Sequence, residues 1–154
     1  MTRAKTNKLS LGWGILSGSV GPRVRLLRNV LSARSISVSA PYGLPTGSLT
    51  VLSLVAANPG SSQTALAHRA GINKSALVGI VDELERRGMA ARDRSSTDRR
   101  RNSLSVTDEG RAAMQALFDQ VTQEEAAIRA SLGDKDLAHL LELLDRAIAA
   151  LEDN

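Results

Sequence analysis

Apolar residues recur with the period of an α-helix over most of this chain, and the pattern is clearest between residues 61 and 88. It predicts one short helix over residues 63–70 and a second over residues 74–87, because each segment carries its apolar side chains on one face. Ala67 is small at the point where two steeply crossing helices need a close approach. The two stripes are Leu66, Ala67 and Ala70, then Leu77, Ile80, Val81 and Leu84, with Ile72 at the corner.

The residues that flank these two segments are typical of helix ends. Ser61 or Ser62 precedes the first helix and Asn73 precedes the second, where such side chains accept hydrogen bonds from the N–H groups of the first turn. Gly71 and Gly88 follow the two helices, and glycine readily adopts the left-handed conformation that ends a helix. These signals predict a helix-turn-helix.

Upstream, the pattern predicts two further helices separated by an irregular segment. Pro22 suits the first turn of a helix, where its missing N–H has no cost. Residues 37–47 contain two prolines and two glycines and are expected to be irregular. The next helix is expected from Ser48 to about Ala57, where Asn58-Pro59-Gly60 ends it. The buried side of the first helix would consist of Val24, Leu27, Val30 and Leu31.

Downstream, the pattern predicts a long helix and then a last one. Thr107 is a suitable N-cap, and the two acidic residues after it would stabilise the positive end of the helix dipole. This helix is expected to reach about Ser131, before Gly133 breaks it and Asp134 caps the last helix. The last helix repeats large apolar residues at near-heptad spacing, which is typical of a helix that packs on a partner. The apolar sides are Met114, Leu117, Phe118, Val121 and Ile128, then Leu137, Leu140, Leu141, Leu144, Ile148 and Leu151.

An arginine-rich segment lies between the helix-turn-helix and the long helix. Residues 89–94 and 102–106 are expected to form two strands, joined by SSTDRRR. Arginine runs are common in solvated loops, but this one directly follows a helix-turn-helix. We therefore expect it to contact phosphates or the minor groove of DNA, whose narrow parts have the strongest negative potential. The arginines are Arg92, Arg94, Arg99, Arg100 and Arg101.

Composition narrows the classes of function. The 154 residues carry a formal net charge of +4 and have a pI of about 10.1, which favours a polyanionic partner. The absence of cysteine excludes disulfides and cysteine-based redox switches. His68 and His139 lie on separate predicted helices without a metal-ligand pattern, so we expect no enzyme, metal site or cofactor. No stretch approaches the length of a membrane span.

Residues 1–19 begin basic and then turn apolar, as a signal peptide does. The apolar run is short, is broken by two glycines and lacks a convincing cleavage site. We therefore interpret this segment as a short helix or as an arm that packs on a partner subunit, with Trp13 as its packing anchor.

The wing and its flanks follow a recognisable pattern. The segment DRSSTDRRRNSLSVTDEGR begins at Asp93, and upstream Tyr42-Gly43-Leu44 leads into LTVLSLVAANPG. These residues resemble the MarR (multiple antibiotic resistance regulator) family of winged-helix repressors, whose wing has an Asp-x-Arg, an Asp-Arg-Arg at the tip and a Leu-Thr exit. Val106 stands where leucine is usual. The matching wing residues are Asp93, Arg94, Asp98, Arg99 and Arg100, and the resemblance extends from about Pro22 to the C-terminus.

The resemblance implies a mainly α fold with a small β-hairpin wing: a winged helix-turn-helix with N- and C-terminal dimerisation helices. Residues 1–154 would form a single MarR-like domain with an N-terminal arm over residues 1–21. Dimerisation helices and a linker would occupy residues 22–45 and 107–154, and the DNA-binding lobe residues 46–106. A homodimer would present two recognition helices to successive major grooves, so its double-stranded DNA operator would be a pseudo-palindrome.

The expected DNA contacts fall into three groups. The start of the first helix of the motif would bind phosphates, and the start of the second would reach base edges. The wing would reach DNA through its arginines, although Arg94 would be structural if it pairs with Asp98 or a neighbouring carboxylate. The residues are Ser62, Gln63 and Thr64; Asn73, Lys74, Ser75, Ala76, Val78 and Gly79; and Arg92, Arg94, Arg99, Arg100 and Arg101.

The resemblance also implies an effector, a small anionic aromatic or related metabolite, bound between the dimer helices and the DNA-binding lobe. It would relieve repression by holding the two lobes at the wrong spacing for DNA. Trp13, Arg25, Arg28 and Tyr42 are the candidate ligand-binding residues, because they offer charge or aromatic surface. The alternative is that these arginines are solvated and that the aromatic rings pack.

These observations predict a ligand-responsive, sequence-specific transcriptional regulator, most simply a repressor, in the cytoplasm of a bacterial or archaeal cell and associated with its nucleoid. Two alternatives stay open. A non-sequence-specific DNA-architectural protein would bind unrelated duplexes equally well. The second is a winged helix that binds only proteins, and the arginine-rich wing argues against it.

Overall fold

The computed structural model of the protein describes residues 11–94 and 102–152, with Asp93, Arg94 and Asn102 described by their backbone alone. The chain divides into two compact units, one up to Arg34 and the other from Ser35. The division falls inside the segment that the sequence analysis assigns to one dimerisation helix and its linker.

The first unit consists of a short N-terminal turn and most of a long helix. A 3-10 helix spans Gly14–Leu16, and helix α1 spans Gly21–Ser39. Arg23 connects the two, because its guanidinium donates hydrogen bonds to the carbonyl oxygens of Ser17 (2.8 Å) and Ser19 (2.7 Å). The same guanidinium lies 4.9 Å from the centre of the Trp13 ring, a cation–π contact. Residues 13–19 therefore fold back on the start of α1.

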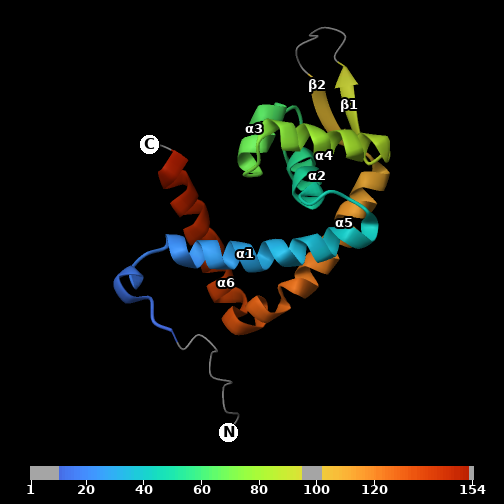
Figure 1. The fold of residues 1–154 in the computed structure, drawn as a ribbon. Coiled ribbons are helices and arrows are strands. Elements are labelled where there is room, and N and C mark those ends of the chain that lie inside the picture. Colours follow the sequence, from blue (N-terminus) through green and yellow to red (C-terminus); the bar gives the residue numbers. More distant parts are fainter. Residues whose placement is uncertain (1–10, 95–101, 153–154) are drawn as a thin grey trace. The chain divides into compact units, whose positions relative to one another are not determined.

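The second unit contains five helices and a two-stranded sheet among its described residues (Figure 1). Residues Ala40–Tyr42 form a 3-10 turn, followed by α2 (Ser48–Ala57), α3 (Gln63–Arg69) and α4 (Lys74–Arg86). Strands β1 (Ala90–Arg94) and β2 (Asn102–Val106) pair antiparallel, with Ala90 opposite Val106 and Arg94 opposite Asn102. Helices α5 (Asp108–Glu124) and α6 (Ala126–Glu152) complete the unit.

The core lies where α2, α4 and α5 meet the base of the hairpin. Leu52, Leu77, Leu84 and Leu117 are the largest fully buried side chains, one or two from each helix. Burial of a leucine side chain contributes roughly 1.5–3 kcal/mol, so these contacts hold α4 in place. The predicted inner stripe of α4, which includes Ile80 and Val81, is confirmed.

Two predicted helix boundaries are wrong. Helix α1 continues to Ser39 rather than ending before Ser37, because Val38 and Ser39 are buried at 6% exposure and burial outweighs the poor helix propensity of serine. Helix α5 ends at Glu124 rather than near Ser131. Glu125 keeps backbone angles of φ −86° and ψ −3°, so this interruption is a slight distortion that no proline or glycine marks. Gly133 has non-helical angles, as expected of a break.

Several apolar residues that were expected to be buried are exposed in the single chain. Val24, Leu27 and Val30 of α1 are 39–45% exposed, and Phe118 of α5 is 51% exposed. Across α6, whose residues are all described, none is buried. Both units therefore carry exposed apolar side chains on these helices.

Candidate nucleic-acid interface

The corner between α3 and α4 has the geometry of a helix-turn-helix. Gly71 adopts a φ of +66°, and the N–H of Ile72 donates to the carbonyl oxygen of Ala67 at 3.1 Å. This is the bond that closes a helix with a left-handed glycine. Leu66 and Ala67 are 3% exposed, so the small Ala67 sits in the tight crossing that the sequence predicts.

The start of α3 combines a cap with exposed polar side chains. Ser62 is the N-cap, and its Oγ accepts a hydrogen bond from the N–H of Ala65 at 3.1 Å. Thr64 is exposed and Gln63 is half-buried. The Ser62 hydroxyl therefore has a structural role in capping, while Gln63 and Thr64 lie beside it at the surface.

Helix α4 turns a polar and sterically small face outward. Asn73 is its N-cap, and its Oδ1 accepts a hydrogen bond from the N–H of Ala76 at 2.8 Å. Val78 is half-buried at the edge of this face. Because the opposite side of the helix is buried in the core, the outward face is free of core packing. Its exposed residues include Asn73, Lys74, Ser75, Ala76 and Gly79.

The far end of α4 is closed by a second left-handed glycine. Gly88 has a φ of +69°, and the N–H of Met89 donates to the carbonyl oxygen of Leu84 at 2.8 Å. Just before this end, Glu83 accepts hydrogen bonds from Arg86 (2.6 and 2.7 Å) and from Arg87 (2.6 Å). These hydrogen bonds, first from Arg86 and then from Arg87, lower the pKa of Glu83 from 4.5 to about 2.

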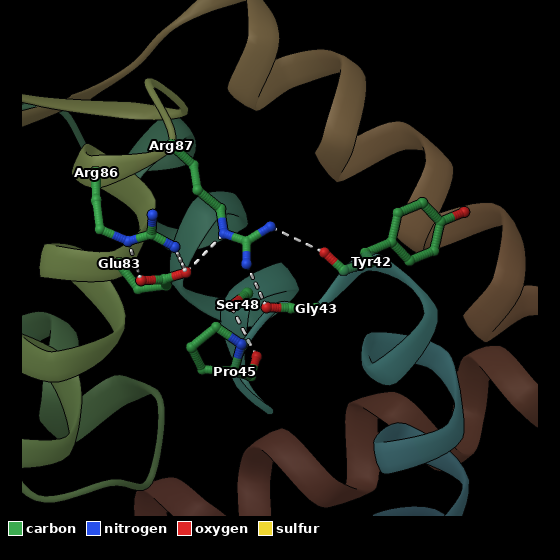
Figure 2. A network of polar contacts seen from close by, with 7 residues as sticks. All are labelled: Tyr42, Gly43, Pro45, Ser48, Glu83, Arg86 and Arg87. Atoms are coloured by element: carbon green, nitrogen blue, oxygen red, sulfur yellow. Dashed lines mark hydrogen bonds and ion pairs between the residues drawn. The ribbon is translucent and has the colours of Figure 1, made fainter.

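Arg87 also reaches out of the helix to the segment before α2. Figure 2 shows its guanidinium between Glu83 and the backbone of residues 42–43. It donates to the carbonyl oxygens of Tyr42 (3.0 Å) and Gly43 (2.7 Å). The end of α4 is thus connected directly to the linker that follows α1.

The base of the wing is held on α4 by Arg92. Its guanidinium donates to Asp82 at 2.6 Å and to Glu85, and its backbone N–H donates to Glu85 at 3.0 Å. The Arg92 side chain is only 25% exposed. Arg92 is one of the predicted DNA contacts, and in the structure its guanidinium joins β1 to α4.

The tip of the wing lies outside the described residues. Arg99, Arg100 and Arg101 belong to that segment, as does Asp98, and of Arg94 only the backbone is described. The expected pairing of Arg94 with Asp98 stays a prediction. Arg92 makes the kind of carboxylate contact that the sequence analysis considered for Arg94.

The candidate effector residues belong to different units. Trp13, Arg25 and Arg28 lie in the first unit and Tyr42 in the second. Trp13 packs against Arg23 and is 37% exposed, while Arg25 and Arg28 are exposed on α1. Tyr42 is 38% exposed, and its backbone carbonyl is the acceptor for Arg87.

Within the described residues, no group of three or more His, Cys, Asp and Glu is placed to hold a metal ion. None of the helices there is both long and apolar enough to span a membrane.

Sequence reasoning missed the polar contacts of Arg87, as it missed those of Arg92. The Glu83–Arg86–Arg87 cluster has a local signal, since residues three and four apart on a helix are neighbours. The contacts of Arg87 with Tyr42 and Gly43 join positions 45 and 44 residues apart and leave no local signal.

The sequence of this chain is similar to those of known transcriptional regulators. The sequence profile of the MarR family matches residues 42–101. A protein of Thauera aromatica, provisionally assigned to transcriptional regulation of the hcr operon, is 32% identical over 146 residues, which cover 93% of this chain and 87% of that protein.

Two similar solved structures carry DNA or a ligand. The transcriptional repressor CouR, bound to a 23-mer DNA duplex, is 33% identical, with a TM-score of 0.75 over 90% of this chain and 98% of that chain. CouR from Rhodococcus jostii RHA1, bound to p-coumaroyl-CoA, is 27% identical, with a TM-score of 0.71 over 84% of this chain and 91% of that chain.

Proposed function

Since the chain belongs to the MarR family of winged-helix, DNA-binding transcriptional regulators, we propose that it is a ligand-responsive repressor that binds an inverted-repeat operator as a homodimer. The observation that carries the proposal is the outward face of α4, which is exposed, polar and small at its N-terminal end. A helix entering the major groove needs such a face. The regulator would act in the cytoplasm, where its operator is.

In this proposal each group of side chains has a distinct role. Gln63 and Thr64 bind phosphates together with the first N–H groups of α3, while Ser62 caps that helix. The wing contributes phosphate or minor-groove contacts, with Arg92 as its anchor on α4 rather than as a DNA contact. The residues that reach base edges are Asn73, Lys74, Ser75, Ala76, Val78 and Gly79. The wing residues that reach DNA are Arg94, Arg99, Arg100 and Arg101.

Fluorescence anisotropy tests the proposal, with the duplex upstream of the protein's own gene and a scrambled duplex of equal length at two salt concentrations. We expect at least about a thousandfold preference for the upstream duplex and a steep salt dependence. Equal binding to several unrelated promoter duplexes and to the scrambled one would instead indicate an architectural protein.

A charge-matched pair of variants tests the role of α4. Lys74→Ala should weaken specific binding by about tenfold or more, because it removes a cation from the reading face. Lys135→Ala removes one exposed lysine from α6 and serves as the control. Equal losses for the two variants would show that α4 is not the recognition helix.

The homodimer is supported by exposed apolar surface and by charge. Leu141, Ile148 and Leu151 of α6 are 55%, 44% and 80% exposed in the single chain, although they continue its predicted stripe. Residues 1–34 contain seven Lys and Arg and no Asp or Glu, whereas residues 108–154 contain eleven Asp and Glu and four Lys and Arg. A second copy would cover the apolar stripe and pair segments of opposite charge.

The effector class we propose is an anionic aromatic compound, and the first to test is an aromatic acyl-CoA thioester. CouR, a relative at 27% identity, is solved with p-coumaroyl-CoA. Helix α1 contains four arginines and no acidic residue, and arginine suits the phosphates of CoA. Calorimetry should detect binding of p-coumaroyl-CoA that weakens in Arg25→Gln and Arg28→Gln. Binding of p-coumarate alone with equal affinity would show that the CoA moiety is not recognised.

A further inference from the structure

The segment between α1 and α2, residues 40–47, is held by side chains of Ser48 and Arg87. On one side, the Ser48 hydroxyl donates to the carbonyl oxygen of Pro45 at 2.7 Å, and Ser48 is fully buried. On the other side, Arg87 donates to the carbonyl oxygens of Tyr42 and Gly43. Figure 2 shows these contacts around one stretch of backbone. Side-chain hydrogen bonds therefore hold the linker against the DNA-binding lobe, in addition to the covalent connection of the chain.

The guanidinium of Arg87 is itself fixed from the helix side. Its Nε donates to Glu83 at 2.6 Å, and the two side chains are 29% and 24% exposed. One planar group thus makes three hydrogen bonds in different directions, two of them to the linker. A lysine has a single flexible ammonium and does not reproduce this fork.

Arg86 is the natural comparison. It follows Glu83 by three residues and is 67% exposed, and within the described residues both of its hydrogen bonds go to Glu83. It therefore shares the charge, the helix end and the carboxylate partner of Arg87. Of these two arginines, Arg87 donates to the linker, whereas the described hydrogen bonds of Arg86 do not reach it.

We propose that Arg87 is a positioning residue for DNA recognition: it holds the Tyr42–Gly43 backbone on the end of α4 and so sets the direction in which the chain leaves the DNA-binding lobe. The proposal rests on the proposed function. In a dimer, this direction sets the spacing of the two recognition helices, which must fit successive major grooves. Non-specific binding depends on charge alone and does not require that spacing.

The first measurement is amide hydrogen exchange of residues 43–48 in the DNA-free protein, for Arg87→Met and the matched Arg86→Met. We expect exchange in this segment to become about tenfold faster in Arg87→Met and to stay unchanged in Arg86→Met, because only the former frees the linker. Equal exchange in the two variants would overturn the proposal at its first step.

The second measurement is anisotropy with the operator duplex and the scrambled duplex. Arg87→Met should lose about five- to tenfold in operator affinity, because the freed linker must be ordered on binding. Its affinity for the scrambled duplex should equal that of Arg86→Met, since both lose one charge. Equal operator affinities in the two variants would overturn the positioning role even if the linker is freed.

A second, more conservative pair of variants keeps the test valid if Arg87→Met does not fold. If circular dichroism shows that Arg87→Met is unfolded, Arg87→Lys and Arg86→Lys replace the pair, with the same expected order and a smaller difference. A wild-type protein without operator preference would refute the proposed function instead. The exchange measurement would still decide whether Arg87 holds the linker.

Discussion

Gly110 lies in the first turn of α5, where a side chain has no room. An added Cβ would lie 1.9 Å from the carbonyl oxygen of Met89 and 2.8 Å from Cγ1 of Val106. The first of these atoms belongs to the backbone and cannot rotate away. We expect Gly110→Ala to lower the free energy of unfolding by roughly 3 kcal/mol, as measured by chemical denaturation.

Gly79 provides the control for this substitution. It lies inside α4, and nothing is within 4 Å of its added Cβ. Gly79→Ala should therefore raise the free energy of unfolding by about 0.5–1 kcal/mol, since alanine is the better helix former. The same variant should bind the operator less tightly if the backbone of α4 approaches DNA there. If Gly110→Ala stabilised the protein as Gly79→Ala does, the carbonyl oxygen of Met89 would not lie against Gly110.

Glu83 makes the stability of the lobe depend on pH. Its pKa in the folded protein is about 2, below the ordinary value of 4.5, because Arg86 and Arg87 donate hydrogen bonds to it. A carboxylate with a lowered pKa stabilises the folded state above its unfolded pKa. This contribution is lost as the pH falls from about 4.5 to about 2.

Denaturation at several pH values tests this. The wild type should have a higher free energy of unfolding than Glu83→Gln at pH 7. This difference should shrink as the pH falls from about 4.5 to about 2. Glu142→Gln, an exposed carboxylate on α6, controls for the general loss of one charge. A difference that does not change with pH would contradict the expectation.

At the scale of elements, the wing depends on a contact between β1 and α4. Arg92 joins Asp82 and Glu85, and its side chain is 25% exposed. Because a charged hydrogen bond in a half-buried site contributes about 1.5–3 kcal/mol, we expect Arg92→Met to destabilise the lobe by a similar amount.

A double-mutant cycle with Glu85→Gln provides the check. The two substitutions should be non-additive by at least about 0.5 kcal/mol, since residues in contact share an interaction energy. DNA affinity should fall for both variants, because each loosens the base of the wing. Additive effects on stability, with loss of DNA affinity confined to Arg92→Met, would restore Arg92 as a DNA contact.

The whole molecule has an uneven distribution of charge. No Asp or Glu precedes Asp82, although nine Lys and Arg do. If the N-terminal segment of one chain faces the acidic C-terminal helices of its partner, salt should weaken the dimer by screening these charges. We expect the dimer dissociation constant from sedimentation to rise about tenfold between roughly 0.1 M and 1 M sodium chloride.

Sodium sulfate and a charge variant separate the two contributions to this interface. Sulfate also strengthens apolar burial, so it should weaken the dimer less than chloride of equal ionic strength. Arg25→Gln combined with Arg28→Gln should reduce the chloride dependence. A dissociation constant that falls as chloride rises would mean that apolar surface alone holds the dimer.

The helix-turn-helix and the start of α5 follow from the sequence by itself. Ser62, Asn73 and Thr107 cap their helices, and Gly71 and Gly88 end theirs, as predicted. These features are local, because a cap or a left-handed glycine bonds groups within five positions along the chain. The same holds for the apolar stripe of α4, whose spacing alone assigns its buried face.

Only the tertiary structure decided which groups Arg87 and Arg92 contact within the chain. Arg92, which was predicted to contact DNA, donates to Asp82 and Glu85 of α4, and Arg87 donates to a linker far away in the sequence. The extension of α1 to Ser39 likewise depends on burial of its last residues. Guanidinium groups bind carboxylates, carbonyl oxygens and phosphates alike, so a sequence does not tell which of them an arginine meets. That depends on which elements pack together, and such contacts join residues that local patterns do not relate.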